Sequence, residues 1–194
     1  MKKEDILKLL PLETDRLIIR PSTLNDVDAL QHATWQRAEI IRKYMSWSSE
    51  EGMSRAGTAG YIQNGLNPDN TRDIPLIAVD KTNGQFVLAT GIHAKDDDFQ
   101  TLLTGWFIAA DYEGKGMAFE AMSVLNRFSF DVIGTQSIET EYYEDNIRSK
   151  NLMERLGFIY TGTQPKAHRC HLDGHMMDIH EYILKRENHE RHRL

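Results

Sequence analysis

Residues 105–118 constrain the fold more than any other stretch, because a strand-like apolar run there passes through a Gly-x-Gly loop directly into a helical pattern. Gly114 and Gly116 supply the loop. A loop of this kind directs successive backbone N–H groups, together with the positive end of the helix dipole, toward a bound anion. The same pattern is also typical of a tight strand-to-helix turn that binds nothing.

The rest of the chain predicts a mixed sheet with helices packed against it. Strands are expected at residues 16–21, 75–80, 86–92, 102–109, 137–143, 158–161 and 177–184, and helices at 3–10, from about 26, and at 50–66, 117–130 and 147–156. Residues 102–143 have the length of one right-handed strand–helix–strand crossover. We expect a single domain over 1–194, with its core at about 12–185 and a solvated, charged tail at 186–194.

Composition narrows the possible partners and the compartment. The 194 residues carry a net charge of −6, so we expect no direct nucleic-acid partner, and an amine partner fits the acidic balance better. Cys170 is the single cysteine, which excludes an internal disulfide and indicates the cytoplasm. Neither an apolar leader nor a run of roughly 20 apolar residues occurs, so no membrane association is expected.

The glycine loop fits neither of two common nucleotide-binding motifs. It lacks the Gly-Lys-Ser/Thr of a phosphate-binding loop and the third glycine of the dinucleotide fingerprint. Instead it resembles the acyl-CoA loop of the GNAT N-acetyltransferase superfamily, Gln/Arg-x-x-Gly-x-Gly/Ala. The six corresponding positions here are Glu113, Gly114, Lys115, Gly116, Met117 and Ala118. Glu113 stands where the family has Gln or Arg, and a carboxylate beside a pyrophosphate is unfavourable unless it turns away.

Two further segments are similar to the same superfamily. Residues 146–158 resemble its Asn-x-x-Ser…Leu-Gly-Phe signature, and residues 12–21 resemble the start of its RimJ/RimL branch of protein N-terminal acetyltransferases. The three segments span residues 12–158 in the family's order. The resemblance implies an α/β fold of mixed α+β type, the GNAT fold. In it a central mixed, mostly antiparallel twisted sheet is splayed between its fourth and fifth strands and flanked by helices.

This resemblance also implies an activity. Acetyl would pass from acetyl-CoA to a primary amine by direct attack, with no covalent enzyme intermediate and no metal. The pantetheine would pair with the backbone of Trp106, Phe107 and Ile108, the pyrophosphate would sit on residues 113–118, and Asn146 would give the cofactor a polar contact. The acceptor would be a protein N-terminus of ribosomal-protein type, or a small polyamine, amino acid or antibiotic. A monomer and a homodimer both fit.

An amine nucleophile must first lose a proton, so the reaction calls for a base or an ordered water. In a strand over 137–143, Glu139, Glu141 and Tyr143 share one face. Glu141 lies five residues before Asn146, where some N-terminal acetyltransferases of the superfamily carry their basic glutamate. We therefore predict Glu141 as the base. The alternatives are that these glutamates are simply solvated, or that Glu139, Tyr143 or a water serves.

The departing CoA thiolate also benefits from a proton donor. Many superfamily members use a tyrosine at the position of Met153, which cannot donate a proton. In the RimL-like branch a serine three residues after the asparagine takes that role, and Ser149 fits this position beside the cofactor. The alternative is that Ser149 satisfies a backbone group in the first turn of its helix.

Three competing interpretations remain at this stage. Histidines and the cysteine crowd the C-terminal region, at His168, Cys170, His171, His175 and His180, but no spacing typical of a four-ligand zinc site occurs there. We expect surface and hairpin histidines instead. Glu113 and Met153 leave open a catalytically silent acyl-CoA-binding module. The glycine loop leaves open a nucleotide-binding protein.

Overall fold

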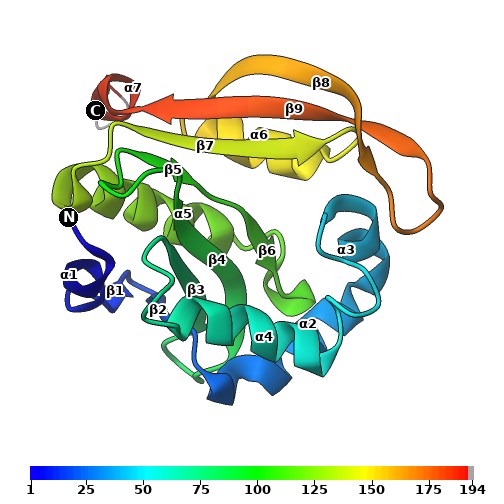
Figure 1. The fold of residues 1–194 in the computed structure, drawn as a ribbon, viewed down its shortest axis with the longest axis horizontal. Helices are drawn as coiled ribbons and strands as arrows, with labels where there is room; N and C mark the ends of the chain where they lie inside the picture. The colour runs from blue at the N-terminus through cyan, green and yellow to red at the C-terminus, as the bar shows by residue number, and fades with distance from the viewer. Residues whose placement is uncertain (192–194) are drawn as a thin grey trace.

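The structure, a computed structural model, describes residues 1–191, which form one mixed, open β-sheet with helices on both faces (Figure 1). The strand order is β1-β2-β3-β4-β5-β7-β9-β8, and β6 pairs with β4. The strands are β1 (Leu12–Glu13), β2 (Leu17–Pro21), β3 (Asp73–Asp80), β4 (Phe86–Ala94), β5 (Thr101–Leu103), β6 (Trp106–Ile108), β7 (Ser137–Tyr143), β8 (Ile159–Arg169) and β9 (Met176–Lys185). Among these strands β5 and β7 pair in parallel and all other pairs are antiparallel, which confirms the predicted mixed sheet.

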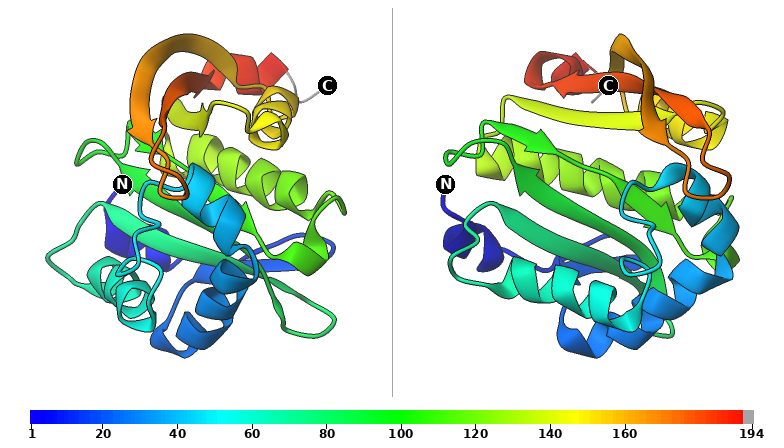
Figure 2. Two further views of the ribbon diagram at one scale, coloured as in Figure 1. Left: turned by 90° about the vertical axis from the view of Figure 1, so that its right-hand side faces the viewer. Right: turned by 45° about the vertical axis from the view of Figure 1, so that its right-hand side comes forward.

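The helices form a layer on each face of the sheet (Figure 2). They are α1 (Lys3–Leu7), α2 (Val27–Gln36), α3 (Ala38–Tyr44), α4 (Arg55–Leu66), α5 (Met117–Phe128), α6 (Ile147–Arg155) and α7 (Arg186–Arg191), with short turns η1 (Leu24–Asp26), η2 (Ala110–Tyr112) and η3 (Ser129–Ile133). Within residues 1–191, no helix has the length and apolarity needed to cross a membrane.

Strand β4 shows how the sheet divides the core between the two layers. Thr90 Oγ1 reaches Met122 Sδ on α5 at 3.5 Å, whereas its neighbour Ala89 packs with Leu30 of α2 and Ile62 of α4. Successive side chains of a strand point to opposite faces, so a strand covered on both faces is apolar throughout. This explains why β4 has a continuous apolar run rather than an alternating one.

The predicted strand at 102–109 is in fact two short strands, and the break between them opens the sheet (Figure 1). Strand β5 pairs with β7, and the Thr104 N–H still donates to Glu139 O at 3.0 Å. Beyond Gly105, β6 pairs with β4 alone. The Thr90 hydroxyl holds this turning point by donating to Gly105 O at 2.8 Å. The predicted splay between the fourth strand, here β5 and β6, and the fifth, β7, is confirmed.

Segments near both ends of the described chain, residues 3–7 and 186–191, form helices that pack against the sheet domain. Residues 186–191 form α7, in which Arg186 donates to the carbonyls of Phe130 and Thr135, and the His189 ring stacks on Phe130 at a centroid distance of 4.9 Å. The prediction of a solvated tail is therefore wrong for Arg186 and His189, and 192–194 lie outside the described residues. Ile6 is fully buried, so the core extends beyond 12–185.

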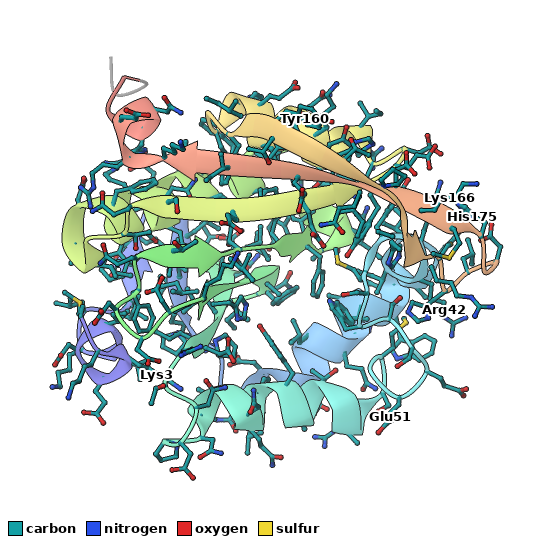
Figure 3. The ribbon with its side chains drawn as sticks, turned by 45° about the horizontal axis from the view of Figure 1, so that its top comes forward. Lys3, Arg42, Glu51, Tyr160, Lys166 and His175 are labelled. Atoms are coloured by element: carbon teal, nitrogen blue, oxygen red, sulfur yellow. The ribbon has the colours of Figure 1, made fainter. Side chains whose placement is uncertain are left out.

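Local boundaries also differ from the prediction. Helix α4 begins only at Arg55, where Ser54 Oγ caps it by accepting from Gly57 N at 3.0 Å, and α3 was not predicted. Strand β8 runs to residue 169 instead of 161, because β9 pairs with it along most of its length. The β8–β9 hairpin thereby reaches α3, where the His171 N–H donates to Arg42 O at 3.0 Å (Figure 3 labels Arg42 on α3 and His175 on the hairpin).

Candidate active site

The predicted anion loop lies between η2 and α5. Gly114 and Gly116 have φ values of +73° and +76°, in the left-handed region that favours glycine. Gly116 is the N-cap of α5 and no side chain caps this helix, so the N–H groups of its first turn have no partner within the helix and no capping side chain. These donors at the N-terminus of a 12-residue helix fit a phosphate.

Glu113 is neutralised by two arginines that the sequence analysis missed. Both Arg37, at the C-terminal end of α2, and Arg148, in the first turn of α6, form ion pairs with its carboxylate. The Arg37 side chain is only 11% exposed, and burial lowers its pKa, although a guanidinium stays charged. The only hint in the sequence was that Glu113 departs from the family pattern.

This cluster gives the loop a net positive charge, since two guanidiniums share one carboxylate. The N-terminal segment secures the loop further. Arg16 Nη1 donates to Lys115 O at 3.0 Å, and Arg16 Nη2 pairs with Glu120 at 2.5 Å. The loop therefore has both the backbone donors and the charge that a pyrophosphate requires.

The exposed edge of β6 offers a second set of backbone groups. The Ala109 N–H donates to Val87 O on β4 at 2.8 Å. Because backbone N–H groups alternate between the two edges of a strand, those of Trp106 and Ile108 point away from β4, toward the opening before β7. No other strand of residues 1–191 pairs with that edge. An extended amide-containing chain such as pantetheine can add to it as a strand would.

Asn146 and Ser149 lie where β7 passes into α6. The Asn146 Oδ1 caps α6 by accepting from Ser149 N at 3.3 Å, which leaves the amide NH₂ of Asn146 for another partner. Ser149 is half-buried in the first helical turn, near the arginine at position 148. Arg148, between these two positions, pairs with Glu113, so the start of α6 lies beside the loop. Asn146 caps this helix, and its role toward a cofactor stays a prediction.

Glu141 is exposed and already has a hydrogen-bond partner. The Tyr143 hydroxyl donates to its carboxylate at 3.1 Å, and desolvation, followed by the charge of Glu141, raises the pKa of Tyr143 to about 12. Glu139 likewise accepts from Lys95 Nζ at 2.8 Å. The predicted shared face exists, but each of its acidic groups has a local partner.

A cavity of about 420 Å³ lies between α2, α4 and the β4–β6 part of the sheet. It is lined by Leu30, Thr34, Met45, Trp47, Gly52, Gly57, Thr58, Tyr61, Ala89, Thr90, His93, Gly105, Trp106 and Phe107. The described lining contains no Asp, Glu, Lys or Arg, and neither Glu141 nor Ser149 belongs to it. The cavity reaches Gly105 and Trp106, where the sheet opens, so it meets the β6 edge from the opposite side to the loop's helix, α5.

The C-terminal histidines contribute one compact cluster. Ligand atoms of Cys170, Asp173 and His175 lie within 4.8 Å of one another in the β8–β9 turn. Asp173 accepts from His175 Nδ1 at 2.5 Å, and this bond is the main reason why the pKa of Asp173 falls to about 2. Asp173 was not considered from the sequence. Three donors are one fewer than a closed zinc site uses.

Comparison with known proteins agrees with this architecture. The family model described as "Acetyltransferase (GNAT) domain" matches residues 16–159, so the chain belongs to the GNAT acetyltransferase family. It is 26% identical over 177 residues to the uncharacterized N-acetyltransferase p20 of Bacillus licheniformis, covering 91% of this chain and 97% of that protein. The resemblance to GNAT N-acetyltransferases is thereby confirmed, and the protein is an acetyltransferase of that family.

Solved structures include members of the RimJ/RimL type. The ribosomal-protein-S5-alanine acetyltransferase from Vibrio fischeri superimposes with a TM-score of 0.79 at 16% identity, over 92% of this chain and 98% of that one. RimL, the ribosomal L7/L12 α-N-protein acetyltransferase solved with coenzyme A, gives 0.77 at 15% identity, over 89% and 95%. At such identities the likeness establishes the fold.

Proposed function

We propose that this protein transfers acetyl from acetyl-CoA directly to a primary amine, with both substrates bound at once. The observation that carries the proposal is the pair of sites that meet at Gly105 and Trp106. One is the edge of β6 with the positively charged loop; the other is the uncharged cavity. Two substrates approaching one point from opposite faces need no covalent enzyme intermediate.

Coenzyme A fits the residues present on the first side. The α5 N-terminus, with Arg37 and Arg148 close by, suits the pyrophosphate, and the N–H groups of Trp106 and Ile108 suit the pantetheine carbonyls. An N–H of β6 can also stabilise the oxyanion that forms on the thioester carbonyl. Ser149, in the first turn of α6, is proposed to donate a proton to the departing thiolate.

The acceptor is proposed to be an α-amino group at a protein N-terminus or a small amine. Two structural neighbours are named for ribosomal-protein substrates, which supports the first source. We propose the cytoplasm as the site of the reaction, on the basis of the single cysteine. A monomer and a homodimer are equally compatible with the site.

Thiol release from acetyl-CoA, measured with a panel of amines, tests this function. Acceleration by at least one amine, with the acetylated product seen by mass spectrometry, is the expected result. If acetyl-CoA binds in calorimetry and no amine accelerates thiol release, the protein is the silent acyl-CoA-binding module. Binding of nucleoside triphosphates in preference to coenzyme A would also overturn the proposal.

A further inference from the structure

His93, in the wall of the cavity, forms a hydrogen-bonded pair with Asp73 behind it. His93 lies on β4 and lines the cavity, and Asp73 is its direct partner across the β3–β4 ladder. The His93 Nδ1 lies 2.9 Å from Asp73 Oδ1, and both side chains are half-buried. Neither residue was singled out from the sequence, because 20 positions separate them.

Asp73 is itself firmly held. Its second oxygen accepts from Asn70 Nδ2 at 2.8 Å. Burial raises the pKa of Asp73, but hydrogen bonds from Asn70 and His93 outweigh burial and leave that pKa below its ordinary value. The carboxylate is therefore ionised at neutral pH and can only accept a proton in a hydrogen bond. This places the proton of a neutral His93 on Nδ1 and leaves the lone pair on Nε2.

Gly91 explains where Nε2 lies. Gly91 and His93 share a face of β4, and a Cβ built on Gly91 would lie only 2.4 Å from His93 Nε2. The imidazole therefore extends along the strand over the bare backbone of Gly91, with Nδ1 toward Asp73. The carbonyl of Gly91 accepts from Thr104 Oγ1 at 3.2 Å, next to the point where the sheet opens. The lone pair of Nε2 is thus held near the meeting point of the two sites.

No other side chain in the described lining of the cavity can accept a proton as His93 can. Tyr61 on α4 is the other titratable residue of the lining, and desolvation, then the charge of Asp73, raises its pKa to about 12, so it stays neutral. Lys3 on α1 acts on Asp73 by its charge, and its ammonium is bonded to the carbonyls of Gly65 and Asn70. On β7, two strands away, Glu139 is paired with Lys95.

The cavity also restricts the size and charge of the part of the acceptor that carries the amine. Its volume lies in the range of about 300–1,000 Å³ typical of small-ligand sites. Its walls are largely aromatic and aliphatic, with the rings of Trp47 and Phe107 6.1 Å apart. These rings can attract one ammonium group, but a second buried ammonium would have no carboxylate in the described lining. A polyamine is therefore disfavoured.

We propose that the cavity binds a primary amine with an uncharged, apolar or aromatic body, and that His93 Nε2 takes the proton from its ammonium group. This inference rests on the proposed function. The freed lone pair attacks the thioester carbonyl, forming the C–N bond and moving the carbonyl electron pair onto oxygen. On collapse the C–S bond breaks, and CoA leaves as the thiolate and takes a proton from the Ser149 hydroxyl. The remaining excess proton on nitrogen then restores that hydroxyl. His93 then releases its proton to water. Asp73 is a positioning residue.

The test compares His93→Gln with His175→Gln, because His175 is paired with an aspartate in the same way but lies in the hairpin turn. With phenethylamine as acceptor, His93→Gln should lower kcat/KM by about 10²–10⁴-fold, the range of general-base help, and His175→Gln should not. Affinity for coenzyme A should be unchanged in both. The loss should shrink as the pH rises and free amine becomes abundant.

Two further variants separate catalysis from folding. Asp73→Asn should lower kcat less than His93→Gln does and leave KM nearly unchanged, because the imidazole keeps Nε2 but loses the carboxylate that orients it. Gly91→Ala should displace the His93 imidazole and lower kcat/KM. When His93→Gln is already present, Gly91→Ala should lower kcat/KM little further, because both changes remove the same imidazole from the site. Additive losses, or an Asp73→Asn variant that changes KM and leaves kcat unchanged, would overturn the assignment.

The choice of amines tests the substrate class and its source. Phenethylamine and a peptide beginning with Phe should both exceed spermidine in kcat/KM by at least about tenfold. A higher kcat/KM for phenethylamine identifies the acceptor as a free small amine, and a higher value for the peptide identifies it as a peptide N-terminus. A preference for spermidine refutes this inference. It is also refuted if His93→Gln turns over like the wild type across neutral pH while Glu141→Gln loses activity. Either result leaves the proposed function standing. Activity with no amine at all refutes the proposed function itself.

Discussion

Replacing Glu113 by glutamine separates the loop's stability from its affinity for coenzyme A. The substitution removes the carboxylate that two guanidiniums share and restores a residue the family uses at this position. In the Arg37–Glu113 pair both side chains are largely buried, at 11% and 28% exposed, whereas Arg148 is 78% exposed. The first pair therefore dominates the loss of stability.

The magnitude follows from this burial. Breaking a buried ion pair costs about 3–5 kcal/mol, and an exposed pair contributes about 0–1 kcal/mol. The glutamine oxygen still accepts a hydrogen bond from Arg37, so we expect a loss of about 1–3 kcal/mol in the free energy of unfolding. For a chain of this length that is a fall in Tm of roughly 2–12 °C.

Coenzyme A should bind no more weakly, because the cluster gains one net positive charge beside the phosphates. The salt dependence of binding should become steeper for the same reason. Thermal unfolding, and calorimetry at two salt concentrations, measure both effects. Asp28→Asn is the control, since the Arg55–Asp28 pair is exposed and should contribute little. An unchanged Tm would refute the argument from burial, and a clear loss of affinity would show that Glu113 orders the loop for binding.

Three further predictions concern the loop before α5, the η1 turn before α2, and the departure of the CoA thiolate. Gly116→Val should abolish most coenzyme A binding, because valine is strained at a φ of +76°, whereas Gly134→Val, at a φ of +91° after η3 and beyond the other end of α5, should not; equal effects would contradict this. Asp26→Ala should cost about 1–3 kcal/mol at pH 7, since Asp26 caps η1 through Thr23 and pairs with Arg20. Burial raises the pKa of Asp26, but its hydrogen bonds outweigh burial and leave this pKa below the ordinary value. The stability difference between wild type and Asp26→Ala should therefore persist above about pH 4 and vanish as the pH falls through the lowered pKa. A difference in urea unfolding that does not change with pH would refute this prediction. Ser149→Ala should lower kcat by less than about 10²-fold with unchanged coenzyme A affinity, and an unchanged kcat would remove Ser149 from the mechanism.

Much of the fold could be predicted from short-range patterns. Strand β4, helix α5 and the loop at Gly114 and Gly116 depend on local preferences, such as the left-handed φ that glycine adopts readily. The order of these segments was sufficient to indicate the family and the mixed sheet. The resemblance to the family predicted the splay, but local patterns could not place the break at Gly105, because it depends on which neighbouring strand each half pairs with.

The sequence by itself determined where a glycine loop opens α5, which we propose binds phosphate, and that Glu113 stands at its first position. Only the tertiary structure decided how that carboxylate is used, because Arg37 approaches it from 76 residues away. In the same way the β3–β4 register, and not any motif, brings Asp73 to His93. The uncharged cavity combines residues from α2, α4 and β6, none of which is distinctive in its own segment. Contacts between distant segments form only when the core packs, so the spacing of residues along the chain does not predict them.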